Sequence, residues 1–287
     1  MKLTVAKDQA FKICQLTDIH LSPLPLNEES KRTVRELTKF LQDQQFDLLI
    51  VTGDLLWGLG NPEPEATLLQ LYEILNQTKT PVAITYGNHD AEGDFSRQQL
   101  RGFERHLKYL ADKHDSYTVF DRQNYVLDIY CDDQIHNKLY VFDSGDYGKW
   151  GIASKYAVIE PEQIMWYLKH SQKRDVNNCD LSFLHIPLPE YRQAVKEELI
   201  AGQHLEEICC GEPNSGLFYA FERQKNVKGV FAGHDHDNNF QSKLAGIELN
   251  YGNISGYNTY CQFARGARII NLYADHFTTE LLSYPES

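Results

Sequence analysis

The stretch Phe46–Asp54, with the sequence FDLLIVTGD, is a strongly apolar run that ends in a glycine and an aspartate. Similar runs occur at Phe11–Leu16 and Pro81–Thr85, and segments with the apolar spacing of helices lie between the three, at Glu29–Gln42 and Glu63–Asn76. Strands this apolar are typical of sheets that are buried on both faces. Their alternation with helices predicts an α/β fold in which helices cover the sheets.

The rest of the chain continues this alternation with one interruption. Helical spacing returns at Phe95–Leu110, and a later helix is predicted at Pro161–His170, with proline in its first turn. Between these two helices, consecutive strands predict a meander. The predicted strands of the meander and of the later chain are Tyr117–Phe120, Tyr125–Cys131, Lys138–Phe142, Leu181–Leu184, Val227–Phe231, Leu244–Leu249, Ala267–Leu272 and Phe277–Leu282. The sequence shows no repeat and no linker, which predicts a single domain over residues 1–287.

The composition is that of a globular protein that can bury a large core. Of 287 residues, 42% are hydrophobic and 24% are charged, and the net charge is −12. A face that binds a nucleic-acid duplex needs clustered lysine and arginine, so no such partner is expected. The sequence has no apolar run that could span a bilayer and no secretory signal pattern at its start. We therefore expect a cytoplasmic protein that does not attach to membranes.

Five short segments rich in metal-ligating side chains each follow a predicted strand. They are Thr17–His20, Gly53–Asp54, Gly87–Asp90, His185 and Gly233–His236. In α/β proteins, ligands collect at the carboxyl ends of strands, where loops can direct several side chains to one place. Each segment alone fits an ordinary turn or a buried histidine. All five together, each at a strand end, favour a shared site.

The side chains in these segments indicate which kind of site this is. Carboxylate, imidazole and amide oxygen suit divalent or trivalent ions such as Mn, Fe or Zn. The lack of thiolate argues against a cysteine-rich structural zinc site. Seven candidate ligands are too many for one tetrahedral ion, but they suffice for two ions if one carboxylate bridges. The candidates are Asp18, His20, Asp54, Asn88, His185, His234 and His236.

In this order, the motifs D-x-H, G-D, G-N-H-D, a lone H and G-H-x-H resemble the signature of the calcineurin-like metallophosphoesterases over about residues 11–275. The resemblance implies a four-layer α-β-β-α sandwich with two central mixed sheets flanked by helices. It also implies that Asp54 bridges two metal ions and that His89 faces the substrate. The first ion would be held by Asp18, His20, Asp54 and His236, and the second by Asp54, Asn88, His185 and His234.

A finer resemblance is to the intracellular, purple-acid-phosphatase-like branch of this superfamily. It is carried by DSGDY at Asp143–Tyr147, by HIPLPEY at His185–Tyr191 and by Asn214–Gly216. In true purple acid phosphatases, a tyrosine after the G-D motif binds iron and gives the colour. Trp57 stands in that place here. Indole offers no lone pair to a metal, so no purple tyrosinate site is expected.

Because Trp57 has no carboxylate, the sequence does not show which group pairs with His89. In the protein phosphatases of the superfamily, an aspartate at this place pairs with the catalytic histidine. Any such partner of His89 must therefore be another carboxylate or a backbone carbonyl. Asp90 and Asp235 are candidates because they are close in sequence to the motifs, although we expect Asp235 to be a turn residue that faces solvent.

The predicted function is that of a metal-dependent phosphoric ester hydrolase. A metal-bridging hydroxide would attack phosphorus directly, and His89 would protonate the leaving alkoxide or stabilise charge in the transition state. The favoured substrate is a phosphate monoester, either small or on a phosphoprotein, because the branch resembles phosphatases. Two alternatives stay open: a phosphodiesterase acting on a nucleotide or lipid headgroup, and a non-catalytic metal-binding scaffold. The sequence does not predict the oligomeric state.

Overall fold

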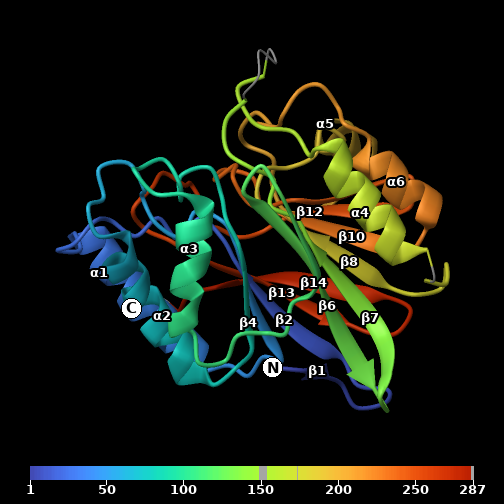
Figure 1. Cartoon of the computed structure of the whole chain (residues 1–287), viewed down its shortest axis with the longest axis horizontal. Helices are drawn as coiled ribbons and strands as arrows, with labels where there is room; N and C mark the ends of the chain where they lie inside the picture. Colours follow the sequence, from blue (N-terminus) through green and yellow to red (C-terminus); the bar gives the residue numbers. More distant parts are fainter. Residues whose placement is uncertain (149–153, 173, 286–287) are drawn as a thin grey trace.

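The computed structural model describes residues 1–148, 154–172 and 174–285. Two β-sheets lie face to face in the middle of the molecule, and helices cover the outer face of each sheet (Figure 1). This arrangement confirms the predicted α/β fold with two mixed sheets flanked by helices.

Within the described residues, the first sheet has five strands, and three of them are the apolar runs that begin the chain. Its strands are β2 (Phe11–Leu16), β3 (Leu48–Thr52), β4 (Val82–Thr85), β13 (Gly266–Leu272) and β14 (Phe277–Ser283). They lie in the order β14-β13-β2-β3-β4. β2, β3 and β4 are parallel, and β13 pairs antiparallel with both β2 and β14. The outer face is covered by α1 (Glu28–Gln42), α2 (Pro64–Thr78) and α3 (Arg97–Phe103) (Figure 1).

The second sheet is larger and contains the meander. Its described strands are β1 (Leu3–Thr4), β5 (His114–Val119), β6 (Arg122–Cys131), β7 (Gln134–Val141), β8 (Asp180–Phe183), β9 (Leu199–Ala201), β10 (Val227–Ala232), β11 (Gln241–Leu244) and β12 (Ile247–Tyr251). Their order is β1-β6-β7-β8-β10-β12-β11-β9, with β5 also paired to β6. β5, β6 and β7 are antiparallel, which confirms the meander. The outer face is covered by α4 (Pro161–Ser171), α5 (Tyr191–Glu197) and α6 (Leu217–Gln224).

Apolar side chains fill the spaces between the layers. Between the two sheets, Ile13 and Ile50 of the first sheet share a fully buried cluster with Leu181 and Phe231 of the second. One further cluster lies between the first sheet and its helices, and another lies between the second sheet and its helices. The burial of this apolar surface is the main force that holds the layers together, and it fixes the strand ends from which the functional loops emerge.

The prediction of a single strand at Leu244–Leu249 is wrong. β11 and β12 instead form an antiparallel hairpin that turns at Ala245 and Gly246. Both turn residues have positive φ angles, 48° and 83°, as two-residue hairpin turns of this kind require. The apolar residues on either side of the turn belong to different strands, which the apolar pattern alone did not separate.

The helix predicted at Phe95–Leu110 is shorter than expected. α3 ends at Phe103, and a 3-10 turn follows at Glu104–His106. The chain then runs beside β4 and pairs with it at Leu110. The backbone N–H of Val82 donates to the carbonyl of Tyr109, and the carbonyl of Val82 accepts from the N–H of Ala111. These tertiary hydrogen bonds end the helix before its apolar pattern does.

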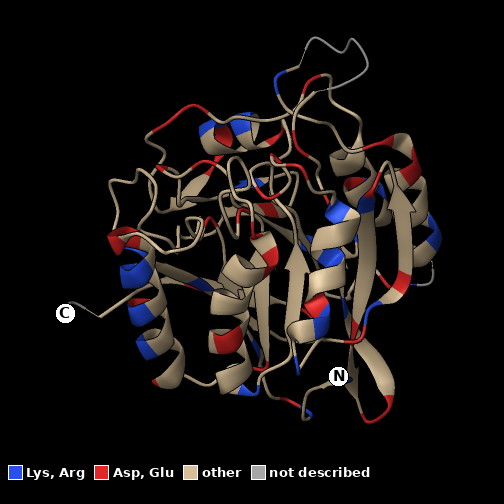
Figure 2. Ribbon diagram, turned by 60° about the vertical axis from the view of Figure 1, so that its left-hand side comes forward, with Lys and Arg blue, Asp and Glu red and all other residues tan. Residues whose placement is uncertain are grey.

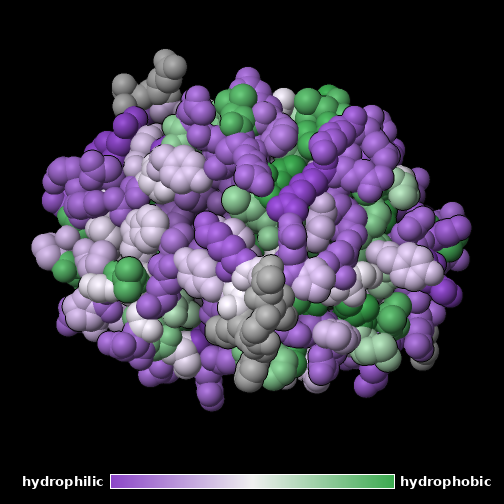
Figure 3. All heavy atoms as spheres, turned by 90° about the horizontal axis from the view of Figure 1, so that it is seen from above, coloured by the Kyte–Doolittle hydropathy of each residue, from purple (hydrophilic) through white to green (hydrophobic). Residues whose placement is uncertain are grey.

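The loops that follow β2, β3, β4, β8 and β10 meet at one edge of the molecule, at the top in Figure 1. Figure 3 looks down on this face, where hydrophilic residues predominate and hydrophobic residues occur in small groups. Among the described residues, lysine and arginine are interspersed with aspartate and glutamate and do not gather on one face (Figure 2). Among the described helices, none has the length and apolar character needed to cross a membrane.

Candidate metal centre

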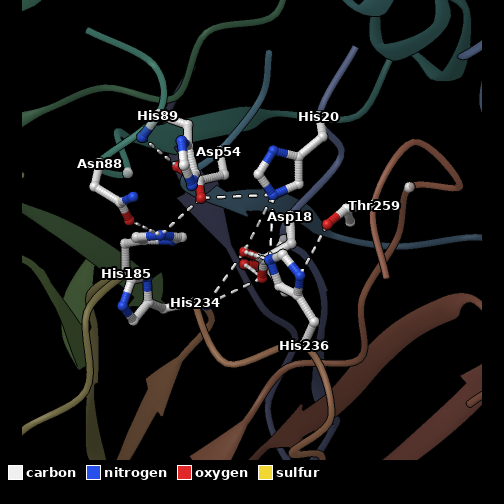
Figure 4. Close-up of polar contacts among 12 residues, drawn as sticks. Asp18, His20, Asp54, Asn88, His89, His185, His234, His236 and Thr259 are labelled. Atoms are coloured by element: carbon white, nitrogen blue, oxygen red, sulfur yellow. Dashed lines mark hydrogen bonds and ion pairs between the residues drawn. The ribbon is translucent and has the colours of Figure 1, made fainter. Parts of the chain in front are cut away.

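The loops at this edge bring all eight predicted site residues together (Figure 4). β2 is followed by Asp18 and His20, β3 by Asp54, β4 by Asn88 and His89, β8 by His185, and β10 by His234 and His236. The labelled side chains converge on the shared carboxylates although they come from both sheets. The fold therefore joins segments that are more than 200 residues apart in the chain, as the contact between His20 and His236 shows.

The ligand atoms form two groups that share Asp54. The first group is Asp18, His20, Asp54 and His236, and the second is Asp54, His185 and His234. Within each group the ligand atoms all lie within 4.8 Å of one another. Asn88 adjoins the second group, because its Oδ1 lies 3.2 Å from Nε2 of His185. These are the two sets that the family resemblance implies, and the role of each residue as a ligand stays a prediction.

Several buried atoms of these groups lack ordinary hydrogen bonds. Oδ2 of Asp54 and Nε2 of His234 have no hydrogen-bond partner among the described residues, although both side chains are buried. Buried polar atoms without a partner are rare and call for an explanation. Carboxylate oxygen and imidazole nitrogen are electron-pair donors that suit Mn, Fe or Zn ions. The residues present therefore fit a centre of two ions.

Two of the histidines are oriented by hydrogen bonds to their outer nitrogens. Nδ1 of His185 lies 2.8 Å from the carbonyl oxygen of Thr52, and Nδ1 of His236 lies 3.0 Å from Oγ1 of Thr259. The carbonyl can only accept, so Nδ1 of His185 carries the donating proton. Such outer contacts fix the ring and leave Nε2 free to bind a metal.

The two carboxylates are held by the loops around them. Asp18 accepts from the backbone N–H of His234 at 3.2 and 3.1 Å and from the hydroxyl of Thr17 at 2.8 Å. Asp54 accepts from the backbone N–H of His89 through Oδ1 at 2.9 Å. This leaves Oδ2 of Asp54 without a hydrogen bond, and that atom lies 3.6 Å from Nε2 of His20 and 3.2 Å from Nε2 of His185.

Four of the candidate ligands have strained backbones. Their φ angles are 53° at Asp18, 49° at His20, 53° at Asp54 and 81° at His234. Residues other than glycine adopt this left-handed region only in a few per cent of cases. Each such position costs on the order of 1–3 kcal/mol and tends to occur at functional sites. The strain is consistent with loops shaped for ligand placement.

The glycines of the motifs let the loops approach closely. A Cβ atom at Gly87 would lie 2.1 Å from Oδ1 of Asp54, and one at Gly53 would lie 2.4 Å from Nδ1 of His185. No side chain fits at such distances. Glycine is thus required before Asn88 and before Asp54 for a steric reason.

Burial and mutual charge set the ionisation of the site. Burial lowers the pKa of His20 to about 3, so its ring is neutral and keeps a lone pair for a metal. Burial is the largest single effect on His185 and opposes its charge, but Asp54, Asp18 and the carbonyl of Thr52 together outweigh it and raise the pKa of His185 to about 9. In turn, His185 holds the pKa of Asp54 well below its ordinary value in spite of burial. A proton on His185 thus balances part of the carboxylate charge, a task that a metal ion would take over.

Comparison with known proteins decides the family. Residues 11–238 match the model of the calcineurin-like phosphoesterases. The chain belongs to this family. Its fold is similar to that of a dimetal phosphatase from Danio rerio, with a TM-score of 0.67 and 12% sequence identity over 97% of this chain and 98% of the other. At this identity, the similarity shows the fold alone.

Relatives of this phosphoesterase carry contrasting names. "Probable inactive purple acid phosphatase 29" of Arabidopsis thaliana is 28% identical over 304 residues, which cover 94% of this chain and 78% of the relative. "Phosphatase DCR2" of Saccharomyces cerevisiae is 29% identical over 271 residues, which cover 83% of this chain and 46% of the relative. These similarities confirm a distant relationship to purple-acid-phosphatase-like proteins, but the names disagree about activity.

His89 of this phosphoesterase lies beside the metal groups and has a partner that the sequence did not predict. Its Nδ1 lies 2.7 Å from Oε2 of Glu92. Its ring meets Trp57 edge to face at 4.4 Å between centroids, and Trp57 also packs over His20 at 4.4 Å. Glu92 follows His89 by three residues, and this spacing was the one feature of the sequence that could have indicated the pair.

The two carboxylates suggested earlier as partners of His89 have other roles. Asp90 is buried and accepts from the backbone N–H groups of Asp54, Leu55, Leu56 and Gly87, which ties the loops after β3 and β4 together. Asp235 is also buried and accepts from the hydroxyl of Tyr251 at 2.5 Å and from the backbone of Cys209. The expectation that Asp235 faces solvent is therefore wrong, because these donors replace the water that its carboxylate needs.

Proposed function

We propose that this calcineurin-like phosphoesterase hydrolyses phosphate monoesters at a centre of two metal ions. The observation that carries the proposal is that Asp54 belongs to two buried groups of ligand atoms, each confined within 4.8 Å. Two ions held there would polarise the phosphoryl oxygens and lower the pKa of a water molecule enough to supply hydroxide near neutral pH. The ligand chemistry suits Mn, Fe or Zn.

The chain's own residues would assist this hydrolysis at two points. Asp54 and His185, whose Oδ2 and Nε2 atoms lie 3.2 Å apart, would both hold the second ion. The ring of His89 retains 24% side-chain exposure, and among the described residues its Nε2 has no hydrogen-bond partner, so this nitrogen can reach a bound ester. His89 would protonate the leaving oxygen or stabilise charge on the phosphoryl group.

A second candidate function is that of a metal-binding protein without hydrolytic activity. The name of the Arabidopsis relative favours it. The candidate ligands and their orphaned donor atoms support metal binding, which both functions share. His89 favours the enzyme, because it lies outside the ligand groups and keeps Nε2 available to a bound ester. A phosphodiesterase would use the same ligands and differs only in the ester that it accepts.

One experiment separates the three functions. The purified protein is loaded with Mn, Fe or Zn, its metal content is measured by elemental analysis, and hydrolysis of p-nitrophenyl phosphate and of bis(p-nitrophenyl) phosphate is followed. The proposal expects two ions per chain and faster hydrolysis of the monoester. Faster hydrolysis of the diester supports the phosphodiesterase. Two ions with no turnover beyond that of the His234→Ala variant support the non-catalytic protein.

A further inference from the structure

The loop after β4 places a carboxylate against the ring of His89. Oε2 of Glu92 lies 2.7 Å from Nδ1 of His89, and the two side chains are only 16% and 24% exposed. Exposed ion pairs contribute little because water screens them and holding both side chains costs entropy. This pair is largely sheltered, and its partners are three residues apart on one turn, so it can hold the ring in a defined orientation.

Trp57 removes any alternative partner on the other side of the ring. The indole packs edge to face against His89 at 4.4 Å, with an angle of 62° between the ring planes. Its Nε1–H donates to the carbonyl oxygen of Asn258 at 3.2 Å. The indole thus confines the imidazole by contact and offers it no acceptor. In the described part of the chain, Glu92 is the carboxylate that pairs with His89.

The second oxygen of Glu92 extends the network to Asn88. The hydroxyl of Tyr147 donates to Oε1 of Glu92 and accepts from Nδ2 of Asn88 at 3.4 Å. With its amide nitrogen turned to Tyr147, Asn88 directs Oδ1 to the second metal group, 3.2 Å from Nε2 of His185. One carboxylate therefore connects two adjacent residues whose side chains serve different parts of the site.

We propose that Glu92 is the positioning residue of His89, and that Tyr147 ties the same carboxylate to Asn88. The carboxylate of Glu92 accepts from Nδ1–H of His89, which keeps a proton on Nδ1 and turns Nε2 towards the ester. The proton that His89 would give to a leaving oxygen is then a second one, carried on Nε2. A histidine ring has two tautomers, and the hydrogen bond made by one nitrogen decides what the other can do. The consequence for rate rests on the proposed function, whereas the consequence for the tautomer does not.

The tautomer is tested by nitrogen NMR of protein labelled with ¹⁵N-histidine and loaded with diamagnetic Zn. The His89 signal is assigned by its absence from the His89→Ala variant. A proton on Nδ1 is expected in the native protein and in Asp94→Asn, a matched control that removes an exposed charge from the same loop. Glu92→Ala should show a ring averaged between both tautomers. A native ring without a proton on Nδ1 would overturn the proposal whether or not the protein is active.

The effect on catalysis is tested by a double-mutant cycle. Glu92→Ala should lower kcat roughly 10–100-fold, the usual loss when an outer partner of a site is removed. KM and metal content should stay unchanged, because Tyr147 can still accept from Asn88. In the His89→Ala background, the same substitution should have almost no effect, because interacting residues are not additive. A loss of equal size in both backgrounds would show that Glu92 acts on the fold and not through His89.

The cycle also separates the two ways in which the account can fail. If the native protein binds two ions and hydrolyses neither ester, the proposed function fails. The NMR signal of His89 then remains the only test of whether Glu92 positions its ring. If the native protein is active and Glu92→Ala matches it in kcat, the positioning role fails while the function stands. Tyr147→Phe should keep the Nδ1 proton but lower metal content, and unchanged metal content would remove Tyr147 from the proposal.

Discussion

Asn88 and His89 are adjacent in the chain, yet their side chains have different surroundings. The amide oxygen of Asn88 faces His185 of the second metal group, whereas the ring of His89 lies between Trp57 and Glu92. The backbone N–H of His89 donates to Asp54, so the turn itself is anchored to the shared carboxylate. The proposed metal ligand Asn88 and the proposed substrate-facing residue His89 can therefore be separated by mutation.

We predict that His89→Ala keeps its metal and loses turnover. Metal content should stay near that of the native protein, while kcat falls roughly 10²–10⁴-fold because a general acid or a charge-stabilising group is missing. If His89 acts mainly as an acid, the loss should be smaller for p-nitrophenyl phosphate than for an alkyl phosphate, whose leaving group needs a proton.

His234→Ala is the contrast, since the loss of a ligand should lower metal content and activity together. Elemental analysis and kinetics on the two variants check the assignment. His89 would have to be reassigned as a ligand if its variant lost metal to the same extent as His234→Ala.

The sequence predicts the members of this site better than their contacts. All eight predicted residues meet, because each lies directly after an apolar strand and strand ends converge in this fold. The partner of His89 and the burial of Asp235 were not predictable. Glu92 lies only three residues after His89, but the residue types of a turn do not show which of its side chains meet. The burial of Asp235 depends on segments from other parts of the chain, which donate to it from Cys209 and Tyr251. Short turn motifs carry no such information.

At the scale of elements, long runs of apolar residues are the features that predict strands most accurately. β2, β3 and β4 are found within two residues of their predicted positions, since long apolar runs leave few other structures. α5, α6, β1 and β9 have at most eight residues each and were not predicted. The β11–β12 hairpin was merged into one strand because its turn is a single Ala-Gly pair.

The loop after β4 provides a prediction at this scale. In Gly87→Ala, the new Cβ would lie 2.1 Å from Oδ1 of Asp54 and 2.7 Å from Nε2 of His185, so the loop must move away from both. Metal content and turnover should fall together while circular dichroism still shows the native fold.

Gly102→Ala is the matched control, because Gly102 lies in α3 and its nearest neighbour is 4.0 Å away. Alanine there should raise the free energy of unfolding by roughly 0.5–1 kcal/mol and leave metal content unchanged. Full metal content and activity in Gly87→Ala would contradict the steric account of this glycine.

At the scale of the whole molecule, the candidate metal centre lies where loops of the two sheets meet. Ligand candidates come from loops of both sheets, so ions that bind the folded state alone would stabilise the sandwich as a unit. Such linkage is worth about 2.7 kcal/mol when the free ion is at 100 times its Kd. Removal of the metal by a chelator should accordingly lower Tm, and the addition of Zn or Mn should restore it.

Metal uptake should also depend on pH through His185. In the metal-free protein, the pKa of His185 is raised to about 9, so its ring carries a proton at neutral pH, whereas a metal binds the neutral ring. The ion must displace this proton, so apparent affinity should rise with pH up to about 9, by up to about tenfold per pH unit for one proton. Calorimetric titration in buffers of different ionisation enthalpy measures the release. Affinity that does not vary with pH, with no proton released, would contradict this ionisation.

The measurement that tests the central claim most directly is the metal content of Asp54→Asn beside that of the native protein. Asp54 is the carboxylate common to both groups of ligand atoms, and a neutral amide is a poor bridge between two cations. Elemental analysis of freshly purified protein should find two ions per native chain and at most one in the variant, with hydrolysis of p-nitrophenyl phosphate nearly abolished. Two ions and near-normal turnover in Asp54→Asn would contradict the shared site, and so would a native protein that binds no metal.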